Sequence, residues 1–405
     1  MEEWKEYKLG ELSEIQTGPF GSQLHQRDYV DDGTPCIMPT NIGNNLDILS
    51  EGIAKVKDED VKRLQKHCVK LGDIIYSRRG DIEKCAFITQ QEEGWLCGTG
   101  CLRIRINPGN TIPLFIAYQL STKECKRWIV GNAVGTTMLN LNTGILKELP
   151  LSIPNIQEQH KIVSILSSLD DKIELNRKIN ANLEAQAQAL FKSWFVDFEP
   201  FKDQPFVESE LGMIPEGWRV TEFKEFIHPM TEKVSVGCLP EYSVTNNGII
   251  PRDAKFNKKL SKETSKNKVL RKNNLVFGMS REILNWGIME DEIGGVSSAY
   301  NIFEINEGII SPVFLRLYMT AKISDFNSII GTAAREGQSL DKGALMQKTI
   351  YIPPKEIVEK FFEIYFSITA LKKEAEQESR RLASLRDVLL SRLMSGELKV
   401  NEIVL

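Results

Sequence analysis

The chain has 405 residues, of which 41% are hydrophobic and 26% charged, and its formal net charge is −4. This length indicates two or three domains, and the composition is typical of a globular protein. A uniformly basic nucleic-acid binder is excluded, so a DNA-binding surface would need locally clustered basic residues. The odd set of seven cysteines has no Cys-x-x-Cys pair, and we see no secretion leader or membrane-length apolar run. We therefore expect reduced thiols and a cytoplasmic location.

The first part of the chain alternates short β-branched stretches with Gly, Pro and Asn, which predicts strands bounded by turns. A helix is expected over Pro113–Trp128, because proline is favoured in a first helical turn. Residues 1–152 thus predict a mixed α/β domain of ordinary size. The expected strands include Cys36–Thr40, Gly72–Ser77, Cys85–Thr89 and Cys101–Ile106.

Residues 153–198 have a different character, since 157–195 contain neither proline nor glycine. Apolar and amide side chains recur alternately four and three positions apart, which is the heptad seam of a coiled coil. The pattern predicts one helix of about 40 residues, roughly 60 Å long. Its seam consists of Ile162, Leu166, Leu169, Ile173, Asn176, Asn180, Leu183, Ala187, Leu190 and Trp194.

Residues 199–351 return to the strand-rich pattern after a linker, and residues 352–405 give a second long helix and a C-terminal tail. A shorter helix is expected over Pro312–Phe326. Strands are expected over Glu241–Thr245, Asn273–Gly278 and Asn301–Ile305. The second seam consists of Phe361, Tyr365, Ile368, Ala375, Leu382, Leu389 and Leu393, interrupted by Lys372, Ser379 and Arg386.

The two halves of the chain are an internal repeat. Leu141–Leu146 matches Leu340–Leu345, and the offset of 199 continues without a gap through both helices. Upstream the match is looser, and Trp4 faces Trp218 at an offset of 214. The two halves therefore share the spacing of their matched segments and differ in the sequence between them. Two domains that recognise different targets would show this pattern.

The fold class that follows is α+β, with two α/β domains that are each followed by a long helix. Two such helices would bury their seams best against each other, and the return of the chain through the second domain favours an antiparallel coiled coil. Polar residues near the middle of both seams would fix the register. The alternative is two separate amphipathic helices, each packed on its own domain.

Both helical regions resemble those of type I restriction-modification specificity subunits. The first carries Ile-Pro-x-x-x-Glu-Gln from Ile153, and the second ends in the Ser-Gly-Glu step at Ser395–Glu397. The Gly-Asp-Ile-Ile run from Gly72 and the stretch Gly135–Asn142 also fit that family. The second copy departs from the Glu-Gln step, since Pro354 and Lys355 follow Ile352-Pro353.

The resemblance implies two target recognition domains, each reading one half of a bipartite site in double-stranded DNA. It implies that the helices set the spacer and dock two methylation subunits, which carry S-adenosylmethionine and methylate adenine. Restriction subunits, with ATP and Mg, would complete the complex. The chain itself would be non-catalytic. Helix pairing and subunit docking would fall on Ile162, Leu166, Leu169, Ile173, Leu183, Leu190, Trp194, Ile368, Leu382, Leu389 and Leu393.

No catalytic or cofactor motif is found in the sequence. An adenine methyltransferase would show Asn-Pro-Pro-Tyr or a close variant, and Pro353-Pro354 stands in Ile-Pro-Pro-Lys instead. No phosphate-binding Gly-x-x-x-x-Gly-Lys loop and no dinucleotide fingerprint occur. A zinc site from His67, Cys68, Cys85, Cys97 and Cys101 is an alternative to buried core thiols, but its spacing fits no common finger.

Basic residues that could contact phosphates cluster before a strand of the second half, against two acidic residues, Asp253 and Glu263. Lysines act there as point charges, which position a protein on DNA without specifying sequence. A solvated loop or helix face is the alternative. The cluster comprises Arg252, Lys255, Lys258, Lys259, Lys262, Lys266, Lys268, Arg271 and Lys272.

Arginine forks are better suited to reading bases. Arg78 and Arg79 follow an expected strand in a turn, and Arg281 holds the matching place in the second half. Arg103 and Arg105 alternate along one strand and so share a face, which would meet DNA or merely solvent. The Gly-rich loop Thr17–Gln23 is either a DNA-approaching tip or a structural turn.

Two other functions remain as alternatives. The chain could be the recognition part of a self-contained methyltransferase-nuclease, although the missing motifs argue against this. It could also be a coiled-coil interaction protein without a DNA role. A salt-dependent, sequence-selective DNA shift would separate a DNA reader from the second alternative.

Overall fold

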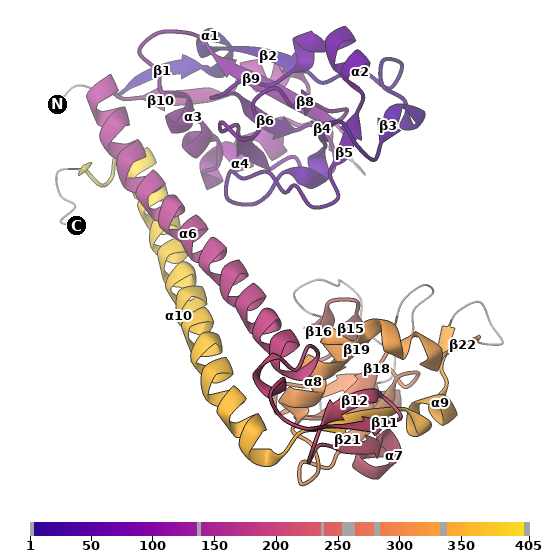
Figure 1. Ribbon diagram of the computed structural model, residues 1–405. Helices are drawn as coiled ribbons and strands as arrows, with labels where there is room; N and C mark the ends of the chain where they lie inside the picture. Colours follow the sequence, from indigo (N-terminus) through magenta and orange to yellow (C-terminus); the bar gives the residue numbers. More distant parts are fainter. Residues whose placement is uncertain are drawn as a thin grey trace. The chain divides into compact units, whose positions relative to one another are not determined.

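The computed structural model describes residues 4–135, 139–235, 239–252, 264–278, 284–332 and 338–400. The chain divides into two compact units (Figure 1). Unit 1 comprises Met1–Lys178 and Ala375–Leu405, and unit 2 comprises Ile179–Glu374. Each unit therefore contains a strand-rich domain and a part of both long helices. No helix among the described residues is long and apolar enough to cross a membrane.

Unit 1 is built on a four-stranded antiparallel sheet in the order β2-β9-β6-β7. A second four-stranded sheet has the order β3-β5-β4-β8, and a two-stranded ladder joins β1 to β10. The strands are β1 (Lys5–Lys8), β2 (Ser13–Thr17), β3 (Tyr29–Val30), β4 (Thr34–Ile37), β5 (Ala54–Val56), β6 (Ile74–Ser77), β7 (Cys85–Phe87), β8 (Leu96–Cys97), β9 (Cys101–Ile106) and β10 (Pro150–Ile153). The shorter helices are α1 (Leu9–Leu12), α2 (Asp58–Arg63), α3 (Pro113–Leu120), α4 (Lys123–Asn132) and α5 (Thr143–Lys147).

Unit 2 repeats this frame. Its sheet β14-β21-β18-β19 has the same antiparallel order, and the β13-β24 ladder corresponds to β1-β10. The frame elements are β13 (Arg219–Glu222), α7 (Phe223–Phe226), β14 (Ile227–Met230), β18 (Leu275–Phe277), β19 (Trp286–Ile288), β21 (Asn301–Ile305), α8 (Pro312–Ala321), α9 (Lys342–Gln347) and β24 (Thr349–Ile352). The repeat predicted from the sequence is thus a repeat of topology.

The two units differ in what they add to the frame. Unit 1 has a second four-stranded sheet, whereas the described part of unit 2 has separate two-stranded ladders. These pair β11 (Phe206–Ser209) with β12 (Gly212–Pro215), β15 (Tyr242–Thr245) with β16 (Gly248–Pro251), β17 (Lys268–Arg271) with β20 (Ile293–Val296), and β22 (Ile330–Thr332) with β23 (Gln338–Leu340). The two units therefore share the central sheet and its flanking ladder, and they differ in the strands added to them.

The long helices are α6 (Ile156–Phe195) and α10 (Lys355–Met394). The prediction of helices without a break is confirmed for both. In unit 1, Ile162 and Leu166 of α6 share a buried core with Leu393 of α10. In unit 2, Phe191 of α6 lies 5.7 Å from Phe361 of α10, measured between ring centroids. Within each unit, the two helices therefore pack on each other as well as on the sheet (Figure 1).

Two expected helices are shorter than predicted, and one of them, expected over Pro312–Phe326, ends at Ala321. The sequence predicted a continuous helix over Pro113–Trp128, but α3 ends at Leu120 and α4 begins at Lys123. The Thr122 hydroxyl accepts a hydrogen bond from the Cys125 N–H and so caps α4. A threonine that satisfies free N–H groups at a helix start favours a new helix over continuation of the old one.

Candidate functional site

Three turns of unit 1 meet at one edge of its central sheet. Because β9 is antiparallel to both β2 and β6, the residues after β2, after β6 and before β9 lie at the same edge. The Gly18 N–H donates to the Cys101 carbonyl over 2.9 Å, and the Arg78 N–H donates to the Gly100 carbonyl over 2.8 Å. We call this surface, made of residues 17–23, 77–81 and 97–101, the unit 1 loop edge.

Arg78 and Arg79 lie on the unit 1 loop edge, as their place after a strand predicted. The Leu141 N–H donates to the Arg78 carbonyl over 2.9 Å, and the Ser77 hydroxyl donates to the Arg79 carbonyl over 3.1 Å. Arg79 also forms a backbone bridge with Asn140. The backbone of the turn is therefore fixed from both sides, while the Arg79 side chain is exposed and Arg78 is half-buried.

Arg103 and Arg105 share a face of β9, but that face is covered. The Arg103 side chain is only 5% exposed, and its guanidinium donates to the Lys66 carbonyl over 2.9 Å and to Glu14 over 3.0 Å. The sequence-based suggestion that Arg103 contacts DNA is therefore corrected, because its buried guanidinium is hydrogen-bonded to other residues of unit 1.

The Arg105 guanidinium forms a bidentate pair with a buried carboxylate. Its Nε and Nη2 lie 2.7 and 2.6 Å from the two oxygens of Asp73, whose side chain is 2% exposed. The hydrogen bonds that Arg105 donates to Asp73 raise the pKa of Arg105. This pairing ties β9 to the turn before β6, so the principal partner of Arg105 is also internal.

The basic cluster of unit 2 is partly described. Four members of the cluster, and also Arg281, lie outside the described residues; these members are Lys255, Lys258, Lys259 and Lys262. Lys266 is exposed. Arg271 donates to both oxygens of Glu232 at 2.8 and 3.1 Å, and Lys272 lies 2.5 Å from Glu292. The charges of Arg271 and Lys272 are therefore balanced locally by carboxylates.

The predicted seam of the helices is buried or half-buried throughout. Ile162, Leu166 and Leu169 are at most 9% exposed, and Ala187 is 4% exposed. The other predicted docking residues are buried or half-buried: Ile173, Leu183, Leu190, Trp194, Ile368, Leu382, Leu389 and Leu393. Most of these side chains belong to the hydrophobic cores that hold the helices and domains together.

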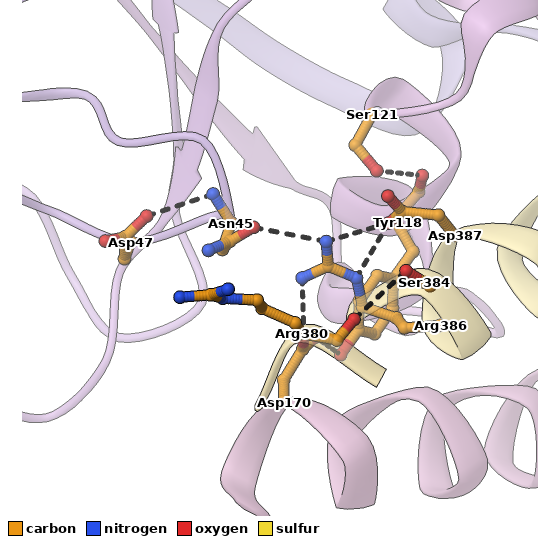
Figure 2. A network of polar contacts seen from close by, with 9 residues as sticks. All are labelled: Asn45, Asp47, Tyr118, Ser121, Asp170, Arg380, Ser384, Arg386 and Asp387. Atoms are coloured by element: carbon orange, nitrogen blue, oxygen red, sulfur yellow. Dashed lines mark hydrogen bonds and ion pairs between the residues drawn. The ribbon is translucent and has the colours of Figure 1, made fainter. Parts of the chain in front are cut away.

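The polar interruption at Arg386 is the centre of a network in unit 1 (Figure 2). Its guanidinium lies 2.8 Å from Asp170 of α6 and 3.1 Å from the Asn45 side-chain oxygen. The Tyr118 hydroxyl of α3 donates to the other oxygen of Asp170 over 2.6 Å. The network therefore links both long helices to α3 and to the loop that carries Asn45.

The same network explains how a charge can sit in a helix seam. Arg386 is 9% exposed, and Asp387 gives it a second carboxylate at 2.8 Å. These carboxylates raise the pKa of Arg386 although its desolvation acts in the opposite direction. Burial, and then the Asp170 carboxylate, raise the pKa of Tyr118. The sequence marked Arg386 only as a break in the heptad, since its partners lie 216 and 341 residues away.

Two further polar contacts join α6 to α10. In unit 1, the Asn176 amide donates to Glu378 over 2.7 Å, and Asn176 is 1% exposed. In unit 2, the Lys372 ammonium lies 2.8 Å from Glu184 and holds the pKa of that carboxyl below its usual value. In each unit the partner numbers fall along α10 as they rise along α6, so the helices are antiparallel there.

The cysteines of unit 1 are mostly core residues. Cys36, Cys85, Cys97, Cys101 and Cys125 are buried free thiols. Burial raises the pKa of Cys36 and of Cys85 to about 12. Over the residues that the structure describes, no group of three or more His, Cys, Asp or Glu side chains is placed to hold a metal ion.

Comparisons with known proteins give one family. Residues 1–185 match the model of the type I restriction modification DNA specificity domain. The MjaIX type I restriction enzyme specificity subunit of Methanocaldococcus jannaschii is 25% identical over 99% of this chain and 95% of its own length. The HindI specificity subunit of Haemophilus influenzae is 32% identical over 50% of this chain and 43% of its own. A solved S subunit from M. genitalium is 17% identical over 96% of each chain, with a TM-score of 0.48.

Proposed function

This chain belongs to the family of type I restriction-modification specificity subunits, and on that premise we propose that it reads a DNA site in two halves. The recognition domain of unit 1 contacts one half-site in double-stranded DNA, and that of unit 2 contacts the other. The helices α6 and α10 set the spacer between the half-sites. Residues 1–152 and 199–351 are the proposed recognition domains.

The observation that carries this proposal is that the central sheet occurs in both units, whereas the strands added to it differ between them. The sheets β2-β9-β6-β7 and β14-β21-β18-β19 have one topology, whereas the strands added to them differ. A common frame lets two domains meet the same kind of ligand in the same manner. Different additions let them contact different base edges, which is where sequence is read.

Within unit 1, the unit 1 loop edge is the proposed DNA-contacting surface. Arg79 presents an exposed fork on a turn whose backbone is fixed by hydrogen bonds. Such a fork can meet the O6 and N7 atoms of guanine with two hydrogen bonds, provided that its mount is rigid. In unit 2, we assign phosphate contacts to Lys258, Lys259, Lys262, Lys266, Arg271 and Lys272, and a base contact to Arg281.

We further propose that the chain is not the catalyst and that its helices dock two methylation subunits. Apolar side chains remain exposed on these helices, including Leu175 and Leu385 in unit 1 and Phe366 and Leu371 in unit 2. Exposed apolar residues at helix surfaces suit a protein interface. S-adenosylmethionine, ATP and Mg would then act on methylation and restriction subunits, and the assembly would work in the cytoplasm.

The decisive experiment is an exchange of the first recognition domain. Residues 1–152 are replaced by the matching segment of a relative, and the assembled complex is expressed in cells that lack other adenine methylation. Sequencing the genomic DNA for modified adenines should show a two-part motif in which one half changes and the other half and the spacer persist. A motif that changes throughout, or not at all, contradicts the assignment of one half-site to each domain.

The two alternatives predict other results in the same cells. A self-contained methyltransferase-nuclease would modify DNA when this chain is expressed without methylation subunits. A coiled-coil protein without a DNA role would leave the modification pattern unchanged, and the purified complex would show no sequence-selective, salt-dependent gel shift.

A further inference from the structure

We propose that Phe20, at the tip of the unit 1 loop edge, is an aromatic wedge that enters a base step of the half-site read by unit 1. The proposal rests on the proposed function and adds to it a mode of contact. Phe20 is 57% exposed, and it follows Pro19, which is buried. A single exposed aromatic ring is unremarkable by itself, so the case depends on how this ring is mounted.

The loop below Phe20 is pressed against the neighbouring turn. A Cβ at Gly18 would lie 2.1 Å from the Gly98 carbonyl oxygen, so the backbones approach too closely for any side chain. The Thr99 hydroxyl donates to the Pro19 carbonyl over 3.0 Å. Glycine is used where one backbone must approach another closely. The start of the loop is therefore fixed to the turn that precedes β9.

The far side of the loop is closed on itself. The Gln23 N–H donates to the Phe20 carbonyl over 2.8 Å, and the Phe20 N–H donates to the Gln23 side-chain oxygen over 3.3 Å. Leu24 then enters a buried core with Cys36 and Val56. Both backbone groups of Phe20 are satisfied within the loop, so the tip offers its surroundings mainly an apolar ring.

The residues near this ring include an exposed arginine, which is suited to contact DNA. The turn at Thr99–Gly100 that supports Pro19 also accepts the Arg78 N–H through Gly100, next to the exposed Arg79. Proteins that kink DNA pair a rigid apolar wedge with arginines that hold the backbone or a groove. Because the backbone that carries the ring is already fixed, insertion costs little further backbone entropy, and stacking against a base is favourable whatever the base.

The frame itself does not require this aromatic residue. In unit 2, the segment after β14 carries Val234 at the matching position, and Val234 is 6% exposed. Its N–H donates to the Asn267 carbonyl over 3.0 Å, so this segment folds back on its own unit. The exposed ring therefore belongs to the content that distinguishes the two domains, and we expect the distortion in one half-site only.

The test uses the full complex of this chain with its methylation subunits, and a duplex that carries its own site with 2-aminopurine placed at successive purines. For the wild type we expect a rise in fluorescence at one step of the unit 1 half-site, away from the adenine that becomes methylated. Phe20→Ala should abolish that rise and weaken binding about tenfold, whereas Phe20→Trp should keep both, because stacking needs only an aromatic face.

Leu71→Ala is the matched control, since Leu71 is 55% exposed and precedes the opposite end of β6. It should change neither signal. Equal binding and equal fluorescence of Phe20→Ala and wild type overturn the wedge while leaving the proposed function intact. The wedge is also overturned if the wild type loses as much binding to a duplex with uracil in place of thymine as Phe20→Ala loses to the normal duplex. That result would mean that Phe20 contacts a thymine methyl group. A wild-type complex without site-selective binding overturns both proposals.

Discussion

The guanidinium of Arg386 lies 2.8 Å from a carboxylate oxygen of Asp170, and this pair joins the two long helices inside unit 1. The side chains are only 10% and 23% exposed. The same carboxylate receives the Tyr118 hydroxyl over 2.6 Å. A buried charge that loses its partner is costly, so the pair fixes which residues of α6 and α10 face each other.

Arg386→Ala should therefore destabilise unit 1 by on the order of 3 kcal/mol, because Asp170 keeps its charge without its main partner. In a thermal unfolding scan, a loss of this size lowers the melting temperature by roughly 6 to 12 °C for a unit of about 200 residues. The double variant Asp170→Leu with Arg386→Met should recover most of the loss, since apolar residues of similar size replace the pair. If the double variant melts as low as Arg386→Ala, the pair does not carry the effect.

Arg79 and Arg103 should respond to alanine substitution in opposite ways. Arg79 is exposed, so Arg79→Ala should leave the melting temperature unchanged and weaken recognition of one half-site by about 1 to 3 kcal/mol. Arg103 is buried and bonded to Glu14 and Lys66, so Arg103→Ala should destabilise the fold by about 1 to 3 kcal/mol. Melting curves and gel shifts on the same two variants check both. A stable Arg103→Ala with altered site preference would reverse the assignment.

Much of this fold was predictable because it follows local rules. The heptad spacing and the lack of Pro and Gly predicted α6 to within one residue at its start, Gln157 against Ile156. Strands such as Cys101–Ile106 were marked by β-branched stretches bounded by turn residues. The repeat predicted the equivalence of the two frames. All of these depend on neighbours in the sequence or on comparison of the chain with itself.

The candidate site was less predictable, because its properties depend on contacts between distant segments. Alternation along β9 correctly placed Arg103 and Arg105 on one face, but only the fold shows that Lys66 and Asp73 cover it. In the sequence Arg386 is only a defect of the seam, because its partner Asp170 lies in the other long helix. In contrast, Arg79 lies where its strand ends, and such a position can be inferred locally.

The Glu184–Lys372 contact should make the helix pairing in unit 2 sensitive to acid. The hydrogen bond from Lys372 holds the pKa of Glu184 below its usual value of 4.5. A carboxyl with a lowered pKa in the folded state stabilises the fold above its unfolded pKa, and that contribution is lost as the pH falls below about 4.5. Melting temperatures measured from pH 6 down to pH 3.5 should fall less steeply for Lys372→Gln than for wild type. The exposed Lys373→Gln serves as control, and equal slopes for all three proteins would argue against the contact.

Lengthening both helices by one heptad should lengthen the spacer of the recognised site. Seven residues add about 10 Å of helix, which corresponds to roughly three base pairs of DNA. The heptad must be inserted in α6 after Asn180 and in α10 after Glu374, because an antiparallel seam keeps its register only if both strands of the coiled coil gain the same length. Sequencing of modified adenines should then show the same two half-sites with a longer gap. Insertion of three residues instead rotates the seam by a fraction of a turn, so this control should abolish modification. Methylation of the original site with its original spacer by the heptad variant would contradict the role of the helices as a ruler.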